Sequence, residues 1–198
     1  MKSLESLLRQ SLGESLEIPA GPFALHRYPD WGEPAEPCAA VVGVDGGDWV
    51  VASAAVDSHL HNRATADNQF TWDLGDVMEL FLQVPGHEDY YEFHSTPEGR
   101  RLQLHLPDYL KLRETPFAAK ICDCDLVVKN AVRDGVWFCE MRVPLARIEA
   151  TAAKGLRYAV CRYNYGPDGE PELSTTMTDA TRGFHNPPNW LVLGTKED

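Results

Sequence analysis

The residues best suited to binding chemistry lie in the segment 72–94, WDLGDVMELFLQVPGHEDYYEFH. Trp72, Asp76 and Glu79 place an aromatic ring and two carboxylates at the start of a segment whose apolar residues alternate with a period of two. Glu79 is flanked by apolar side chains, and an unpaired buried carboxylate is costly. We therefore expect Glu79 to contact water or a ligand, and this end of the segment to be a ligand site rather than core.

The two carboxylates are a poor pair for hydrolysis of a glycosidic bond. That reaction needs two carboxyl groups about 5–10 Å apart on either side of the bond. Asp76 and Glu79 are three residues apart, so on a strand their side chains face opposite sides of the sheet. The chain also has no Ser-His-Asp, P-loop or HExxH pattern. We therefore expect no catalytic residues and predict that the protein is not an enzyme.

Two other short motifs contain residue types that bind metal ions. Asp57, His59 and His61 could form an imidazole–carboxylate site, because alternate residues of an extended chain share a face. Cys122 and Cys124 form a C-x-C pair, but no second pair follows at zinc-finger spacing. Polar surface residues and reduced thiols explain the two motifs more simply, so the metal ligands stay unassigned.

The composition argues against several classes of partner. The chain has 198 residues, of which 18 are basic and 30 acidic, for a net charge of −12. Nucleic acids and anionic membranes bind positively charged surfaces, so we expect neither as a partner. No apolar run approaches the roughly 20 residues that span a bilayer. The N-terminus has no signal-peptide pattern, so we expect a cytoplasmic protein with free thiols, or a secreted one if a leader was removed.

The segments that must position residues 72–94 are predicted to be short β-strands. Residues 76–84 and 90–95 form a hairpin around a polar turn. Further strands are expected at the following ranges: 23–27, 39–45, 49–57, 101–106, 126–132, 136–143, 156–165 and 190–193. About ten short strands with regular turn signals predict an all-β fold, an antiparallel, jelly-roll-like β-sandwich that forms a single domain over residues 1–198.

The remaining segments are expected to be a helix and a loop. Leucines at 4, 7, 8 and 12 predict a short N-terminal helix in an extension over residues 1–17, and residues 166–189 are expected to be mostly irregular. On the strands, the following side chains are expected to point into the core: Met78, Leu80, Leu82, Leu102, Leu104 and Leu106. Polar side chains dot the opposite faces, which we expect to be solvated: Glu79, His94, Gln103, Glu140, Arg142, Arg162 and Asn164.

Four blocks of sequence, taken in order, resemble a known family. They are WVVASAAVDS, then TWDLGDVMELFLQ with YYEFHSTPEG, then VWFCEMRVPLARI with LRYAVCRYNYG, and finally FHNPPNWLVL. From about residue 40 to the C-terminus, the chain resembles the family 9 carbohydrate-binding modules (CBM9) and their DOMON-like relatives. The W…D-x-x-E-L-F-L block and the closing F-H-x-P-x-x-W block are the most specific parts of the resemblance.

The resemblance implies a β-sandwich that binds a mono- or oligosaccharide between two aromatic rings. Trp72 falls on the family's first stacking tryptophan, and Phe184 falls near the second, where it replaces tryptophan. Glu79 falls on a carboxylate that binds sugar hydroxyls, and His94 lies near a position that is often a basic ligand. Some members bind structural calcium, which makes calcium the cofactor that the resemblance allows. The chemistry agrees, because a pyranose ring packs on an aromatic plane while its hydroxyls need donors and acceptors.

Two functions of different classes follow from these observations. The first is a non-catalytic carbohydrate-binding module, in which Trp72 and Phe184 face each other across a cleft with Glu79 on its floor and His94 beside it. The second is an intracellular interaction or structural domain of the same fold that has lost sugar binding. The replacement at Phe184 and the missing signal-peptide pattern favour the second function.

Overall fold

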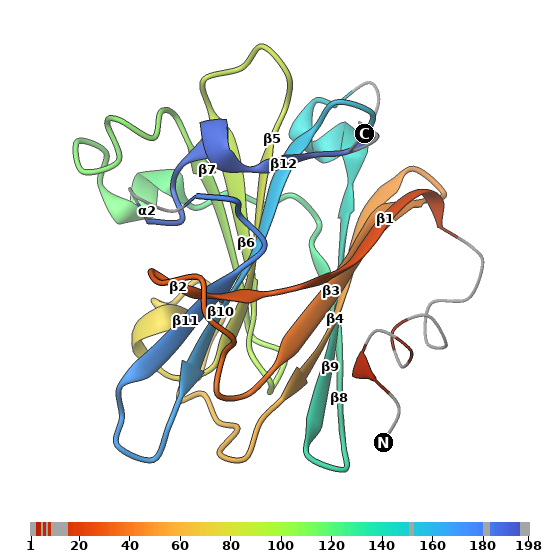
Figure 1. The fold of residues 1–198 in the computed structure, drawn as a ribbon. Helices are drawn as coiled ribbons and strands as arrows, with labels where there is room; N and C mark the ends of the chain where they lie inside the picture. Colours follow the sequence, from red (N-terminus) through yellow and green to blue (C-terminus); the bar gives the residue numbers. More distant parts are fainter. Residues whose placement is uncertain are drawn as a thin grey trace.

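The protein folds into two antiparallel β-sheets packed face to face (Figure 1). The computed structural model describes residues 3, 4, 6, 8, 16–150, 153–179 and 183–194. The strands are β1 (Glu17–Ala24), β2 (His26–Tyr28), β3 (Cys38–Asp45), β4 (Asp48–Val56), β5 (Val77–Gln83), β6 (Tyr90–Ser95), β7 (Arg101–Leu106), β8 (Val127–Arg133), β9 (Val136–Pro144), β10 (Arg157–Tyr165), β11 (Pro171–Thr175) and β12 (Leu191–Val192). The short helices are α2 (Phe117–Lys120) and the 3-10 turns η1 (Thr71–Asp73), η2 (Leu145–Ile148) and η3 (Pro187–Asn189). The predicted all-β antiparallel sandwich is confirmed.

The main core lies between the two sheets. The five-stranded sheet has the order β1-β3-β4-β9-β8, and the seven-stranded sheet has the order β2-β11-β10-β5-β6-β7, with β12 beside β10. Trp49 and Trp137 from the first sheet pack with Leu80, Phe93 and Tyr158 from the second. All five side chains are buried. This core fixes the orientation of β5 and β6, the two strands that carry the predicted polar site residues.

The expectation for residues 166–189 is wrong in part, because β11 forms there. Its residues Pro171–Thr175 pair with β10 on one side, and three of them pair with β2 on the other. The segment PELST has a weak strand pattern of its own, so its neighbours in the sheet decide its conformation. The strand expected at 23–27 is also divided, because the chain passes from the first sheet to the second at Leu25.

The leucines of β7 point to the opposite face from the one expected. Leu104 pairs with Glu92, and both side chains lie on the outer face of the seven-stranded sheet. Leu104 belongs to a second apolar cluster there, together with Phe81 and Trp190. Gln103 points inward instead, and its Oε1 accepts backbone hydrogen bonds from Cys124 and Leu126 at 3.0 and 3.1 Å. Both faces of this sheet are therefore buried in this region. For this reason the apolar face of a strand, read from the sequence, does not show which side of the sheet faces the main core.

Arg162 was expected to be solvated, but it is buried between the sheets. It pairs with Met78 across β10 and β5 and is 1% exposed. Its Nη2 donates to Asp57 Oδ2 at 2.8 Å and to the Val56 carbonyl at 2.9 Å. Asn164 Oδ1 accepts a further hydrogen bond from the same nitrogen at 2.8 Å. A buried charge needs such partners, and here they close one end of the sandwich.

The predicted N-terminal helix is described only in part. Leu4, Ser6 and Leu8 have helical backbone, and most of the extension over 1–17 lies outside the described residues. Leu8 is buried in a small cluster with alanines on the outer face of the five-stranded sheet.

The five cysteines are free, and the predicted burial of Cys139 and Cys161 is confirmed. In the part of the chain that the structure describes, no helix has the length and apolar character needed to cross a membrane.

Candidate functional site

A cleft of about 640 Å³ opens on the outer face of the seven-stranded sheet. Its floor comes from β5, β6, β7 and β10, and its walls come from β2 and from the loops around η1, α2 and residues 183–185. Figure 1 shows α2 beside the β7 edge of this sheet. Trp72, Glu79 and Phe184 all line this cleft, so three of the four predicted site residues come together there.

One wall of the cleft is a group of three aromatic rings. Trp72 makes an edge contact with Phe70 at 5.2 Å, and Phe70 stacks on Phe117 of α2 with 4.1 Å between ring centroids. The backbone that carries Trp72 is held firmly, because Asn62 Nδ2 donates to the carbonyl of Thr71 at 3.0 Å. Sequence reasoning identified Trp72 but missed Phe117, because α2 reaches the cleft only through tertiary packing.

A second group of aromatic rings in the lining of the cleft is built around Phe184. This ring is 6% exposed and makes edge contacts with Tyr28 of β2 at 5.6 Å and with Tyr163 of β10 at 5.9 Å. Trp190 Nε1 donates to the Phe184 carbonyl at 2.9 Å and so fixes the loop that carries the ring. Trp72 and Phe184 therefore belong to two separate aromatic groups that line one cleft, although most of the Phe184 ring is covered by its neighbours.

A buried polar cluster lies at the floor of the cleft. Glu79 of β5 pairs directly with His94 of β6, and Glu92 lies two residues away on the same face. His94 Nε2 lies 2.7 Å from Glu92 Oε1 and 3.3 Å from Glu79 Oε1. On the other side of the ring, His94 Nδ1 lies 2.7 Å from Thr71 Oγ1. His94 is thus beside Glu79 as expected, but it is fully buried and lies below the surface of the cleft.

The three titratable groups of this cluster have shifted pKa values. Burial raises the pKa of Glu79, the negative charge of Glu92 adds to the effect, and His94 opposes it. Burial also acts to raise the pKa of Glu92, but His185 and the hydrogen bond with His94 outweigh it and hold that pKa below its usual range. Burial acts to lower the pKa of His94, but Glu79 and Glu92 outweigh it, so this pKa is raised. The site therefore pairs an ionised Glu92 with a Glu79 that retains its proton more easily.

Basic side chains lie at the rim of the cleft. Arg113, Lys120 and His185 contribute to its lining. His185 Nδ1 lies 2.8 Å from the hydroxyl of Tyr90, which fixes the imidazole ring. The sequence contained a signal for Glu92, because it alternates with His94 in YYEFH and must share its face. It held no comparable signal for Arg113 and Lys120, which lie in the irregular segment after β7 and in α2 and reach the cleft through tertiary packing.

The other candidate residues have structural roles. Asp76 accepts backbone hydrogen bonds from His61 at 2.6 Å and from Tyr165 at 2.7 Å, which ties two loops to the start of β5. Burial is the largest cause that raises the pKa of Asp76, to about 6. Asp57 pairs with Arg162, so the Asp57-Ser-His59-Leu-His61 motif does not converge on a metal site. The sulfur atoms of the C-x-C pair lie 3.6 Å apart.

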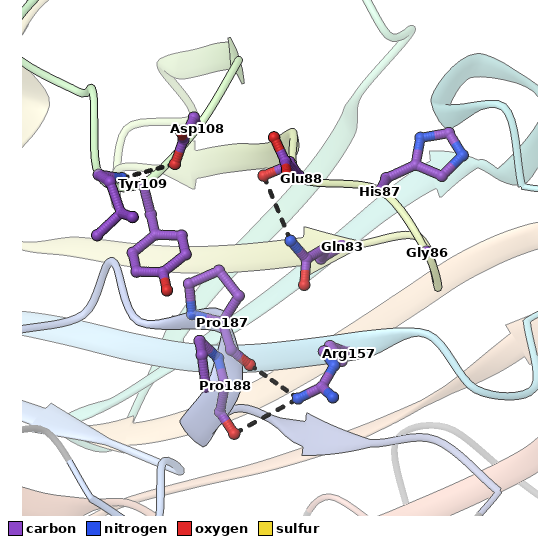
Figure 2. A pocket seen from close by; sticks show the side chains of 10 residues that line it. Gln83, Gly86, His87, Glu88, Asp108, Tyr109, Arg157, Pro187 and Pro188 are labelled. Atoms are coloured by element: carbon purple, nitrogen blue, oxygen red, sulfur yellow. Dashed lines mark hydrogen bonds between the residues drawn. The ribbon is translucent and has the colours of Figure 1, made fainter.

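A second, more polar hollow of about 440 Å³ lies near the turn between β5 and β6 (Figure 2). Arg157 Nη1 donates to the carbonyls of Pro187 and Pro188 at 3.2 and 3.4 Å. Gln83 Nε2 donates to the carbonyl of Glu88 at 3.5 Å. Figure 2 shows Arg157 pointing at the two proline carbonyls of the closing loop. These hydrogen bonds help to hold the segment that carries Phe184. The hollow has no aromatic walls comparable to those of the cleft.

Comparisons with known proteins identify similar folds. No family model and no curated protein matches the chain. A CBM9 module from Caldicellulosiruptor kristjanssonii in complex with glucose has a TM-score of 0.61 at 9% identity, covering 96% of this chain and 89% of that one. The same organism's CBM9 module with cellotriose has a TM-score of 0.56 at 9% identity, with 88% and 77% covered. A carbohydrate-binding candidate from Bacteroides uniformis has a TM-score of 0.59 at 16% identity, with 78% and 76% covered. The chain therefore has a CBM9-like fold.

Proposed function

We propose that the protein is a non-catalytic carbohydrate-binding module that holds a sugar ring in the aromatic cleft. The main support is that two aromatic groups, around Trp72 and Phe184, line one cleft together with Glu79 and Glu92. An aromatic plane covers the C–H face of a pyranose and buries apolar area at a small entropic cost. Glu79 and Glu92 can accept hydrogen bonds from sugar hydroxyls, while Arg113 and Lys120 can donate to them.

The arrangement of the carboxylates supports binding rather than hydrolysis. Glu79 and Glu92 lie on neighbouring strands of one floor and share contacts with the same imidazole. A glycosidase needs its carboxyl groups on either side of the scissile bond. The structures with similar folds include carbohydrate-binding modules with glucose and cellotriose. We therefore propose glucose and short cello-oligosaccharides as the first ligands to test.

Isothermal titration calorimetry of the full chain with glucose, cellobiose and cellotriose tests this proposal. Trp72→Ala removes a stacking surface worth on the order of 1–2 kcal/mol, so the affinity should fall by about 5- to 30-fold. The matched control is Trp31→Ala, because Trp31 is also partly buried but lines a different hollow. Equal losses in the two variants, or an unchanged affinity in Trp72→Ala, would contradict binding in this cleft.

One observation favours the second candidate function, an interaction domain without sugar binding. Glu79 is 3% exposed and its Oε1 lies 3.3 Å from Nε2 of the buried His94, so only a small part of its carboxyl group reaches the cleft. A glycan array that finds no ligand, together with no calorimetric signal for the three sugars at about 10 mM, would replace the sugar proposal with this one.

A further inference from the structure

The polar cluster at the floor of the cleft has a composition that sugar binding does not require. It contains Glu79, Glu92 and His94, the one group of three or more metal-ligand side chains that converges within the described residues. We propose that these three residues form a binding site for a divalent first-row transition-metal ion of the zinc type, with one coordination position open to the cleft. This site goes beyond the proposed sugar binding and does not depend on it.

The distances between the donor atoms suit a small ion. The donor atoms of the three residues all lie within 4.8 Å of one another. A tetrahedral ion with bonds of about 2.0–2.1 Å places neighbouring ligand atoms about 3.3 Å apart. Glu79 Oε1 and His94 Nε2 already have this separation, at 3.3 Å. Glu92 Oε1 is 2.7 Å from the same nitrogen, so its flexible side chain must withdraw by about 0.6 Å.

The donor types select the class of ion. One imidazole and two carboxylates form a mixed nitrogen and oxygen set, which suits zinc and its neighbours rather than calcium or magnesium. Two carboxylate charges also neutralise a divalent ion, which matters in a site where all three side chains are buried. A metal-bound histidine usually forms a hydrogen bond through its second ring nitrogen, which fixes the orientation of the ring. Here Thr71 Oγ1 lies 2.7 Å from Nδ1 and holds Nε2 toward the carboxylates.

Glu79 is the member of the cluster whose hydrogen bonding leaves room for an ion. Its carboxylate is 3% exposed and lines the cleft, yet within the described residues it accepts no hydrogen bond. Glu79 Oε1 lies 3.3 Å from His94 Nε2, but the hydrogen bond of that nitrogen goes to Glu92. Buried carboxylates are normally satisfied by hydrogen bonds, ions or metals. A metal ion bound to Glu79 would supply the missing partner. The open coordination position of the ion would then face the cleft.

The test uses the full chain after treatment with a chelator and complete removal of that chelator. Titration with Zn²⁺ in the calorimeter should give one ion per chain with micromolar or tighter affinity. Titration with Co²⁺ should give the intense visible absorption of a four-coordinate ion. Binding to His94→Gln should be about 100-fold weaker or more, and Thr71→Val should lose about 10-fold because it removes only the outer partner.

The control variant is His105→Gln, which removes a half-exposed histidine paired with Asp89 outside the cleft. It should bind Zn²⁺ as the wild type does. Circular dichroism without metal verifies that each variant is folded, and Glu79→Gln replaces His94→Gln if the latter is not. Sub-stoichiometric or millimolar Zn²⁺ binding, a purely six-coordinate Co²⁺ spectrum, or equal affinity for Ca²⁺ would overturn the proposal. Because no sugar is present, a failure of sugar binding leaves this result unaffected.

Discussion

Replacing Glu79 by glutamine should change how the stability of the protein depends on pH. Burial raises the pKa of Glu79 from the ordinary 4.5 to about 8, with Glu92 adding to the shift. The folded state therefore holds a proton that the unfolded state releases, so stability falls as pH rises from about 4.5 through 8. Glutamine has nearly the shape of the protonated carboxyl but does not titrate, so Glu79→Gln should lack this loss.

The size of the effect follows from the environment of the side chain. At pH 5 the two proteins should differ by less than about 0.5 kcal/mol, because glutamine replaces a neutral carboxyl. At pH 9 the wild type buries a carboxylate without a hydrogen bond, which costs about 1–3 kcal/mol, so the variant should be the more stable one by that amount.

Urea unfolding at pH 5 and pH 9, followed by tryptophan fluorescence with a chelator present, measures both differences. Glu114→Gln is the control, because Glu114 is exposed in the loop before α2 and should change the stability little at either pH. A Glu79→Gln variant that is less stable than the wild type by the same amount at both pH values would refute the reasoning. That result would mean that the carboxylate is ionised throughout and is stabilised by His94.

Three further predictions concern other parts of the molecule. Asp57→Ala leaves Arg162 buried without its carboxylate and should cost about 3–5 kcal/mol in urea unfolding, whereas a loss below about 1 kcal/mol would contradict the buried ion pair. Phe184→Trp should strengthen sugar binding a few-fold in calorimetry by enlarging the stacking surface, and weaker binding would indicate that the ring only packs against its aromatic neighbours. Cys122 is the least buried thiol, but the hydrogen bond between the two sulfur atoms raises the pKa of Cys122 and lowers that of Cys124, so mass spectrometry should find one of these two thiols alkylated first in the native protein, with all five cysteines labelled only in denaturant.

The strands could be predicted from the sequence because their pattern is local. Residues 90–95 and 101–106 are strands at the predicted bounds, since each alternates clearly and ends at a turn or proline. The strand Pro171–Thr175 was not predicted, because PELST has a weak strand pattern of its own and its outer partner β2 is distant in sequence, although its other partner β10 is the neighbouring strand of a hairpin. The same limit applies to the cleft, where Trp72, Glu79 and Phe184 were identified but Lys120 was not.

The faces of the larger sheet explain why the polar cluster was only half predicted. Alternation separates Glu92 and His94 from Tyr91 and Phe93, but it does not reveal that both sets are buried. The outer face is covered because β7 adds its leucines there and the closing loop brings Trp190 onto them. A carboxylate on that face is thereby removed from water and must be satisfied by a neighbour or a ligand. Burial on both sides of β6 thus turns an ordinary alternating strand into the floor of a binding site.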